Sequence, residues 1–226
     1  MTRRDLPPGG SSGTRAHRAW YEFVRYLLWL IFLVCYRVRC GGRKNIPATG
    51  GVLILANHQS LLDPPLFGMV VPREVNYVAR DTLFDNKLLG AFIRSVNAIP
   101  IDRDGLGLAG LKETLRRLKR GEIVILFPEG TRTPNGEIQP LKPGFSALVK
   151  RTGACILPMA VDGSYQAWPR KQPLPLPNLI QIEVGPPITN EAAAALDERE
   201  LITLVDQRIR DCFAQARNKR KRRLWR

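Results

Sequence analysis

Hydrophobic positions along the chain form short continuous runs and longer periodic runs, and the two kinds alternate from residue 45 onward. A short continuous run is typical of a buried strand, and a period near 3.6 residues is typical of a helix. The runs that predict strands are 51–56, 75–79, 98–101, 123–127, 155–161 and 180–184. The runs that predict helices are 66–71, 83–95, 106–119 and 145–150. Strands that alternate with helices predict an α/β domain with a largely buried sheet.

A different hydrophobic pattern precedes this domain. Residues 26–36 are apolar all round, and as a helix they would measure about 16 Å, roughly half of a bilayer core. We therefore expect a helix that lies in a membrane interface or dips into one leaflet. A core helix of a soluble protein would give the same pattern and stays open. A signal peptide is disfavoured because no small-residue cleavage site follows the run.

The charge of the chain is concentrated at its two ends. The net charge is +15, of which residues 1–44 and residues 217–226 carry +7 each and residues 45–216 carry +1. This division predicts a basic N-terminal arm over 1–44 that contains the membrane-interacting helix, a catalytic domain over 45–216 and a basic C-terminal tail over 217–226. Such arms suit a polyanionic surface, either nucleic acid or anionic lipid.

The C-terminal tail follows a predicted amphipathic helix. The apolar positions of that helix are Leu201, Leu204, Val205 and Ile209. A solvated run of charge is one interpretation of the tail. The apolar pair 224–225 inside the basic cluster favours the other interpretation, an anionic lipid surface.

The cysteines and histidines form no metal-binding motif. The chain has four cysteines without a CxxC spacing, and two histidines. This usage indicates a reduced compartment, and we expect neither a structural metal nor a tightly bound cofactor.

The first candidate for chemistry follows directly on the strand predicted over 51–56. His58 stands just past the end of that strand, where α/β proteins place their ligands. Asp63 is expected at the start of the next helix as its N-cap, because Pro64 fits the first helical turn. The pair can serve as a base and its orienting carboxylate. A loop histidine beside a capping aspartate is the alternative interpretation.

Two further segments also lie just past predicted strands. Phe127–Arg132 reads Phe-Pro-Glu-Gly-Thr-Arg, in which Gly130 permits close approach of the backbone to a ligand. The guanidinium of Arg132 offers a fork for an anion. In the other segment, Asn97–Arg103, Arg103 follows the strand predicted over 98–101. Each segment taken alone is weak evidence.

Taken together, these segments resemble the glycerolipid acyltransferase family, which includes 1-acylglycerol-3-phosphate acyltransferases. Asn57–Asp63 resembles the family's NHxxxxD block and Phe127–Arg132 its FPEGTR block. Asn97–Arg103 is similar to its G-x-I-P-I-x-R block, with Asn97 in place of the usual glycine, and Ile156–Met159 is similar to a short apolar block with a proline. The order and spacing agree over about residues 46–162.

The resemblance implies a mixed, largely parallel sheet flanked by helices, like that of glycerol-3-phosphate acyltransferase, and transfer of a fatty acyl group from a thioester to a glycerol hydroxyl. His58 would be the general base and Asp63 would orient its ring. The residues implied to bind substrate are Asn57, Arg103, Glu129, Gly130, Thr131 and Arg132. Glu129 is anionic, so we expect it to bind a hydroxyl or to anchor an arginine. Lys142 is a further, weaker candidate for the acceptor's phosphate.

The implied reaction makes phosphatidic acid from 1-acylglycerol-3-phosphate in phospholipid biosynthesis. The donor would be acyl-CoA or acyl carrier protein, and no metal or cofactor is implied. Another lysophospholipid or an amino-lipid is the alternative acceptor. A basic nucleic-acid-binding protein is a distant alternative, because it leaves the motif blocks without a role and no nucleic-acid motif occurs.

The implied location is a membrane surface. Positive residues flank the apolar helix on both sides, at Arg15 and Arg18 before it and at Arg37 and Arg39 after it. Positive residues tend to stay on the cytoplasmic side of a membrane. We therefore expect a monotopic or peripheral protein on the cytoplasmic face.

Overall fold

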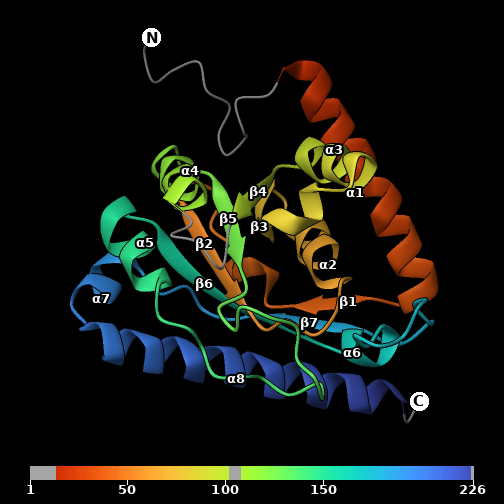
Figure 1. Cartoon of the computed structure of the whole chain (residues 1–226). Helices are drawn as coiled ribbons and strands as arrows, with labels where there is room; N and C mark the ends of the chain where they lie inside the picture. Colours follow the sequence, from red (N-terminus) through yellow and green to blue (C-terminus); the bar gives the residue numbers. More distant parts are fainter. Residues whose placement is uncertain (1–13, 102–107, 225–226) are drawn as a thin grey trace.

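A seven-stranded sheet forms the centre of the molecule, in the order β1-β7-β6-β2-β5-β3-β4 (Figure 1). The structure is a computed structural model that describes residues 14–101 and 108–224 of the chain. The strands are β1 (Arg39–Gly41), β2 (Val52–Ala56), β3 (Val75–Arg80), β4 (Ala98–Ile101), β5 (Ile123–Leu126), β6 (Cys155–Asp162) and β7 (Gln181–Val184).

The sheet is mixed and largely parallel, which confirms the predicted fold class. The three central strands β6, β2 and β5 run parallel, with Leu53 opposite both Val124 and Ile156. The pair β6 and β7 is the antiparallel one. The short strand β1, which pairs with β7, was not predicted because its sequence, Arg-Cys-Gly, contains no apolar run.

Eight α-helices and two 3-10 helices surround the sheet in the described part of the chain. The α-helices are α1 (Arg15–Tyr36), α2 (Asp63–Val70), α3 (Lys87–Ser95), α4 (Leu108–Lys119), α5 (Phe145–Thr152), α6 (Ser164–Ala167), α7 (Asn190–Ala194) and α8 (Glu198–Leu224). The 3-10 helices are η1 (Arg43–Asn45) and η2 (Asp81–Phe84).

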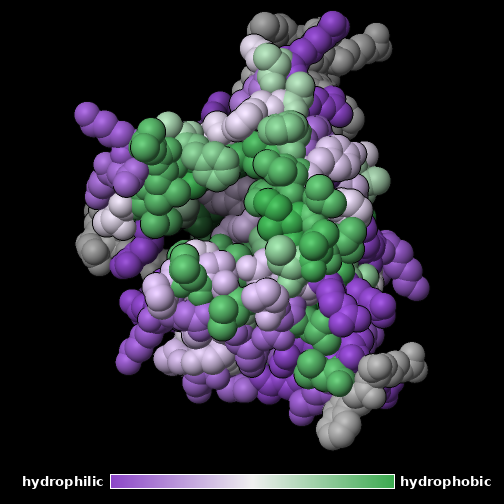
Figure 2. Space-filling model, turned by 90° about the vertical axis from the view of Figure 1, so that its right-hand side faces the viewer, coloured by the Kyte–Doolittle hydropathy of each residue, from purple (hydrophilic) through white to green (hydrophobic). Residues whose placement is uncertain are grey.

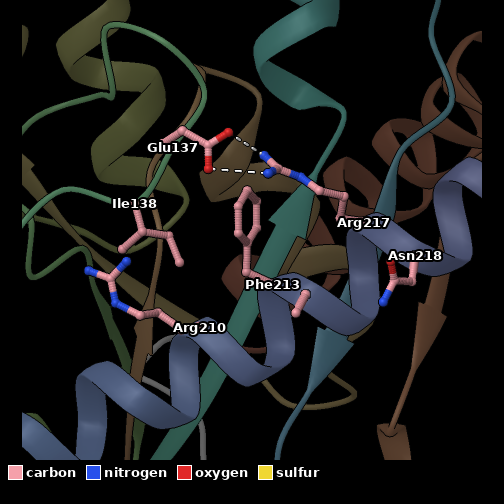
Figure 3. Close-up of a pocket in the computed structure, with 7 residues that line it drawn as sticks. Glu137, Ile138, Arg210, Phe213, Arg217 and Asn218 are labelled. Carbon is pink, nitrogen blue, oxygen red and sulfur yellow. Dashed lines mark hydrogen bonds and ion pairs between the residues drawn. The ribbon is translucent and has the colours of Figure 1, made fainter.

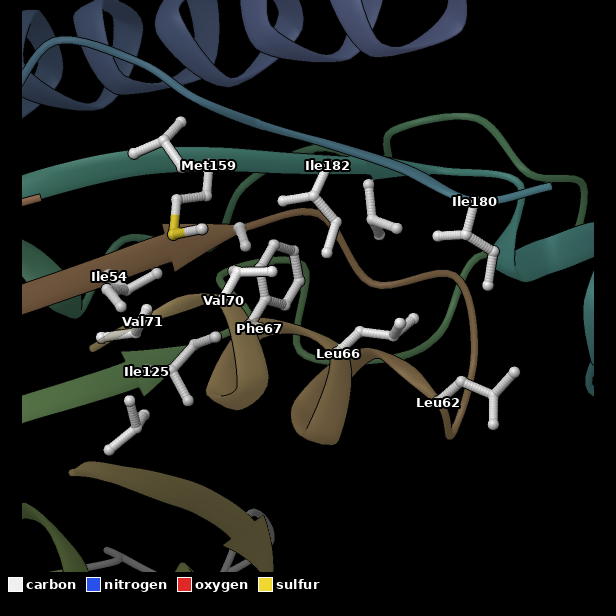
Figure 4. Packing of buried hydrophobic residues seen from close by; sticks show 14 of the residues in the cluster. Ile54, Leu62, Leu66, Phe67, Val70, Val71, Ile125, Met159, Ile180 and Ile182 are labelled. Atoms are coloured by element: carbon white, nitrogen blue, oxygen red, sulfur yellow. The ribbon is translucent and has the colours of Figure 1, made fainter. Parts of the chain in front are cut away.

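Helices cover both faces of the sheet. The first face packs against α1 and α2, and Figure 4 shows Phe67 and Val70 of α2 against Ile54, Ile125 and Met159 of the strands. The second face packs against α4, α5, α7 and α8. Adjacent residues of β2 therefore belong to different cores, and all five of its residues are buried. This arrangement explains why the strand reads as a continuous apolar run.

Some helix boundaries differ from the prediction. The helix predicted over 66–71 begins earlier, at Asp63, and Leu62 rather than Asp63 is its N-cap. Asp63 does not cap the helix because its carboxylate accepts hydrogen bonds from residues that precede it. The helix predicted over 83–95 is divided into η2 and α3, because Asn86 caps α3 by accepting from the backbone N–H groups of Leu88 and Leu89.

The N-terminal helix α1 lies against the body of the protein through one side only. Its residues Tyr21, Val24, Phe32 and Tyr36 are buried. The Tyr21 hydroxyl accepts from the backbone N–H of Val75 at 3.0 Å. The other side of α1 leaves large apolar side chains exposed, as described below.

The basic C-terminal segment is helical rather than a separate tail. Helix α8 continues without a break to Leu224, and its basic residues reach acidic partners on the sheet and on a loop. Arg220 pairs with Asp162, Lys219 lies 2.6 Å from Glu183, and Arg217 forms two hydrogen bonds with Glu137. Three basic residues of the segment predicted as a basic C-terminal tail are therefore paired within the domain.

Candidate active site

The carboxyl ends of β6, β2 and β5 bring the motif segments together. These strands are parallel neighbours, so their carboxyl ends meet at one edge of the sheet. The segment that contains His58 follows β2, the segment that begins at Phe127 follows β5, and Ser164 follows β6. Segments far apart in the sequence therefore line one site.

His58 and Asp63 are hydrogen-bonded to each other. The distance between His58 Nδ1 and Asp63 Oδ2 is 2.9 Å. The His58 side chain is 14% exposed, whereas that of Asp63 is fully buried. A carboxylate only accepts, so Nδ1 donates, and in the neutral ring Nε2 then carries the lone pair. The histidine can therefore take a proton from a group that enters the site.

The Asp63 carboxylate is held by three further donors. Its Oδ2 accepts from the backbone N–H groups of Gln59 at 2.6 Å and Ser60 at 2.7 Å. Its Oδ1 accepts from the Ser164 hydroxyl at 2.6 Å. The two backbone contacts form the tight turn over 59–63, because both N–H groups donate to the same carboxylate oxygen.

The imidazole ring is also held from its face. Phe127 stacks on His58, with ring centroids 4.1 Å apart and an angle of 17° between the planes. Phe127 in turn packs against Phe67 of α2. The ring of His58 is thus fixed by a hydrogen bond at one nitrogen and by an aromatic contact on its face.

Glu129 supports the backbone of His58. Its Oε1 accepts from the His58 backbone N–H at 2.7 Å, and its Oε2 accepts from the Gln139 backbone N–H at 2.9 Å. Burial raises the pKa of Glu129 to about 7, although these two hydrogen bonds act in the opposite direction. Both of these contacts are with backbone donors, and the expected contact of Glu129 with a hydroxyl or an arginine stays a prediction.

The residues after Glu129 form a turn beside the site. Gly130 has a φ of +71°, and a Cβ there would lie 3.2 Å from Lys142 Nζ. The backbone N–H of Thr133 donates to His58 O at 2.8 Å, which ties the turn to the histidine. Thr131 is exposed and Arg132 is partly buried. Burial and the nearby charge of Arg170 lower the pKa of Arg132.

Asn57 joins two strands beyond the end of β2. Its amide donates to Val161 O at 3.0 Å and accepts from Val161 N at 2.8 Å. The residue is buried, so it belongs to the frame that supports the His58 segment. Its predicted contact with substrate stays a prediction.

The third motif segment is only partly described. Arg103, predicted to bind the acceptor, lies outside the described residues. Asn97, which stands where the family usually has glycine, has a φ of +69°. Asparagine tolerates this left-handed conformation better than most residues, so the turn survives the substitution.

Sequence reasoning missed Ser164 and Gln59 as parts of the site. Gln59 donates to Gly136 O at 2.8 Å and accepts from the backbone N–H of Tyr165, so it links three loops. Neither residue type is distinctive in a sequence. The position of Ser164 just past a predicted strand, as for His58 and Phe127, was the available signal.

The described residues contain no group of three or more His, Cys, Asp and Glu side chains that could hold a metal ion. The four cysteines are free thiols. Burial raises the pKa of Cys40 to about 12 and that of Cys212 to about 11, so both are protonated at neutral pH.

A cavity of about 240 Å³ lies elsewhere, between α8 and the loop that follows Thr133 (Figure 3). Its lining residues are Glu137, Ile138, Arg210, Phe213, Ala214, Arg217 and Asn218. Its arginines are already paired, Arg217 with Glu137 and Arg210 with Asp206. The Arg217–Glu137 pair joins the loop to α8, whereas Arg210 and Asp206 both lie on α8. The cavity contains none of the motif residues.

Comparison with known proteins shows which family the chain is similar to. The Acyltransferase family model matches residues 37–162. A 1-acyl-sn-glycerol-3-phosphate acyltransferase of Bacillus subtilis is 29% identical over 88% of this chain and 98% of its own length. One of Pseudomonas aeruginosa is 34% identical over 80% of this chain and 75% of its own length.

A solved structure agrees with these sequence relatives. The 1-acyl-sn-glycerophosphate (LPA) acyltransferase PlsC of Thermotoga maritima superposes with a TM-score of 0.76 at 26% identity, covering 88% of this chain and 80% of its own. The family model covers more than half of the chain and includes the His58 and Phe127–Arg132 segments. The chain therefore belongs to the acyltransferase family and is an O-acyltransferase.

Proposed function

We propose that this protein transfers a fatty acyl group from an acyl thioester to the free hydroxyl of 1-acylglycerol-3-phosphate, which yields phosphatidic acid. The observation that carries the proposal is the hydrogen bond between His58 Nδ1 and Asp63 Oδ2 at the carboxyl end of β2. In the neutral ring this bond leaves Nε2 as the atom that accepts a proton. The names of the relatives from Bacillus subtilis and Pseudomonas aeruginosa support the choice of acceptor.

His58 acts as the general base in the proposed reaction. Its Nε2 takes the proton of the acceptor hydroxyl while that oxygen attacks the thioester carbonyl carbon. The tetrahedral intermediate then expels the thiolate, which receives the proton from the imidazolium. Asp63 orients the ring and stabilises its positive charge between these steps. A base positioned in this way typically contributes about 10²–10⁴-fold to the rate.

The acceptor's phosphate is proposed to bind to the cations beside the FPEGTR turn. Neither Arg132 nor Lys142 forms a salt bridge within the described ranges 14–101 and 108–224, although the charge of Asp63 acts on Arg132. Gly130 leaves room next to the Lys142 side chain. Arg103 is proposed as a third cation on the basis of its motif. Glu129 contributes indirectly, because it holds the backbone of His58.

The acyl donor is proposed to be acyl-CoA or acyl carrier protein. Both present the same thioester, and the base acts on the acceptor rather than on the donor. The two carriers differ in the part of the molecule outside the thioester, so they would contact the protein surface differently. The kcat/KM values for the two donors therefore distinguish them. An acyl-enzyme intermediate is unnecessary because the thioester is already activated.

The protein is proposed to work on an anionic membrane surface, at the cytoplasmic face. Helix α1 is the one described helix that is long and apolar enough to cross a membrane by length and composition. Its exposed large side chains include Phe23, Tyr26, Leu30 and Val34. Figure 2 views the molecule from the α1 side and shows hydrophobic residues on both sides of a hollow.

Exposed apolar residues outside α1 support the same surface. Leu88, Leu89 and Phe92 on α3 are exposed, as are Leu174 and Leu176 in the loop before β7. Exposed apolar groups gathered in this way mark a partner or a membrane. A lipid acceptor and a fatty acyl chain both reside at a bilayer, so a membrane is the occupant that the proposed reaction requires.

The experiment measures acyl transfer by the purified full chain. The donor is labelled acyl-CoA or labelled acyl-acyl carrier protein, the acceptors are a panel of lysolipids, and the products are identified by mass. The proposal predicts phosphatidic acid from 1-acylglycerol-3-phosphate at the highest kcat/KM of the panel. A higher kcat/KM with a lysophospholipid that bears another headgroup, or with an amino-lipid, would contradict the choice of acceptor.

A further inference from the structure

The Asp63 carboxylate is held unequally at its two oxygens. Oδ2 accepts from His58, Gln59 and Ser60. Oδ1 accepts from the Ser164 hydroxyl at 2.6 Å, and among the described residues no other group donates to it. Asp63 and Ser164 are both 0% exposed, so this hydrogen bond is shielded from solvent.

The position of Ser164 is fixed by the sheet. Ser164 begins α6 just after β6, and β6 pairs with β2 with Met159 opposite Ala56. The preceding Gly163 has a φ of +105°, and a Cβ there would lie 2.2 Å from the backbone oxygen of Leu179. The chain can make this sharp turn only with glycine, and the turn directs the serine hydroxyl at Asp63.

The hydroxyl proton of Ser164 goes to Asp63. Ser164 Oγ also lies 3.2 Å from Gln59 Oε1, but a hydroxyl has one proton to donate. The contact with Asp63 is shorter and its acceptor is charged, which makes it the stronger hydrogen bond. Gln59 Oε1 has another donor in the backbone N–H of Tyr165.

We propose that Ser164 is a positioning residue for acyl transfer, whose hydroxyl fixes the Asp63 carboxylate and through it the ring of His58. This inference rests on the proposed role of His58 as the base. No motif block of the family includes this serine. Its effect is indirect, because it contacts the carboxylate and not the substrate.

Loss of the hydroxyl has two consequences for the catalytic pair. A buried carboxylate oxygen without a donor binds a proton more tightly, and its charge attracts the imidazolium more strongly. Both effects increase the affinity of the His58–Asp63 pair for a proton. The carboxylate also loses the hydrogen bond that fixes Oδ1 and is held through Oδ2 alone, so the ring is aligned less firmly with the acceptor hydroxyl. The charged groups that face the pair, Glu129 and Arg132, are unchanged by this substitution.

The test compares Ser164→Ala with Ser146→Ala in the full chain. Ser146 is an internal control because it is also a buried serine that donates to a carboxylate at 2.6 Å, in its case that of Glu198. The Ser164→Ala variant is expected to lower kcat about tenfold with little change in the KM of either substrate. The acid limb of its pH–rate profile is expected to move to higher pH. Ser146→Ala is expected to leave kcat and the acid limb unchanged.

A second measurement separates this inference from the proposed function. The chain has only two histidines, so NMR titration of the rings follows His58 directly, with His58→Ala assigning the signal. A higher His58 pKa in Ser164→Ala supports the inference whatever the acyl acceptor is. Restoration of the original titration by Ser164→Thr, which keeps the hydroxyl, supports it further. An unchanged His58 pKa in Ser164→Ala, or equal losses of kcat in both alanine variants, would overturn it.

Discussion

At the scale of single residues, the site is organised around one buried carboxylate. Asp63 gathers the donors of the 59–63 turn on one oxygen and the Ser164 hydroxyl on the other. Glu129 connects the backbone of two segments, because its carboxylate accepts from the backbone N–H groups of His58 and Gln139. Two acidic residues of the motif blocks thus hold the geometry, and the cations are left for the substrate.

Arg132→Ala is expected to raise the KM for 1-acylglycerol-3-phosphate about tenfold or more. The variant loses a charge-assisted hydrogen bond to the phosphate, worth about 1.5–3 kcal/mol. Steady-state kinetics with the acceptor varied measure the effect. Lys171→Ala is the control, because Lys171 is an exposed cation outside the motif blocks. Equal KM values for Arg132→Ala and the unmodified protein would remove phosphate recognition from Arg132.

The raised pKa of Glu129 predicts a specific pH dependence of stability. Its pKa is about 7 in the folded protein against an ordinary value of 4.5, so the folded state binds more protons between these values. The free energy of unfolding should therefore fall as pH rises from about 4.5 to about 7. Glu129→Gln should flatten this slope, as measured by urea unfolding across the pH range. An equally steep slope in the variant would assign the dependence to other groups.

At the scale of elements, the C-terminal end of α8 is a structural part of the domain. Arg220 pairs with Asp162, and the Asp162 side chain is 1% exposed. Asp162 precedes the Gly163–Ser164 turn, so this end of α8 also supports the site from behind. Deletion of 217–226 would leave buried carboxylates unpaired, and it would therefore test stability as well as lipid binding.

Arg220→Ala is expected to destabilise the protein by about 1.5–3 kcal/mol, the worth of its hydrogen bond to the buried Asp162 carboxylate, because Arg217 Nε stays 3.6 Å from that carboxylate. Lys221 follows Arg220 in α8 and is exposed. Lys221→Ala is expected to change the unfolding free energy by less than about 0.5 kcal/mol. Urea unfolding at neutral pH measures both values. Similar stabilities for the two variants would contradict the structural role of Arg220.

The elements were predicted well where burial leaves a continuous signal. Strand β2 is buried on both faces, so its sequence is a continuous apolar run that predicts the strand. The end of that run predicts that His58 lies at the end of the strand. The pairing of α8 with Asp162, Glu183 and Glu137 was not predictable, because a run of Lys and Arg carries no mark of the acidic side chains that it will meet. Ser164 was missed for the same reason: its partner Asp63 lies 101 positions away in the sequence.

At the scale of the whole molecule, α1 has two distinct sides. Tyr21, Phe32 and Tyr36 belong to the buried side, so removal of the entire helix would open the core. The opposite side presents Tyr26, Leu30 and Val34, which are 63%, 53% and 69% exposed. Substitution of this outer side, rather than deletion of the helix, is therefore the appropriate test of membrane attachment.

The triple variant Tyr26→Ser, Leu30→Ser and Val34→Ser is expected to lose binding to anionic liposomes at both low and high salt, since burial of apolar area is not screened by ions. Lys221→Ala with Arg222→Ala is expected to weaken binding only at low salt. Co-sedimentation at the two salt concentrations measures both variants. Full sedimentation of the triple variant in high salt would contradict the role of α1 as the anchor.

If the His58–Asp63 pair carries acyl transfer, His58→Ala must lose most of its turnover. The measurement is the initial rate of phosphatidic acid formation from labelled acyl thioester and 1-acylglycerol-3-phosphate, with the fold checked by circular dichroism. A folded variant whose rate has fallen by about 10²-fold or more is expected. A folded His58→Ala protein that turns over at the rate of the unmodified chain would contradict this role of the pair.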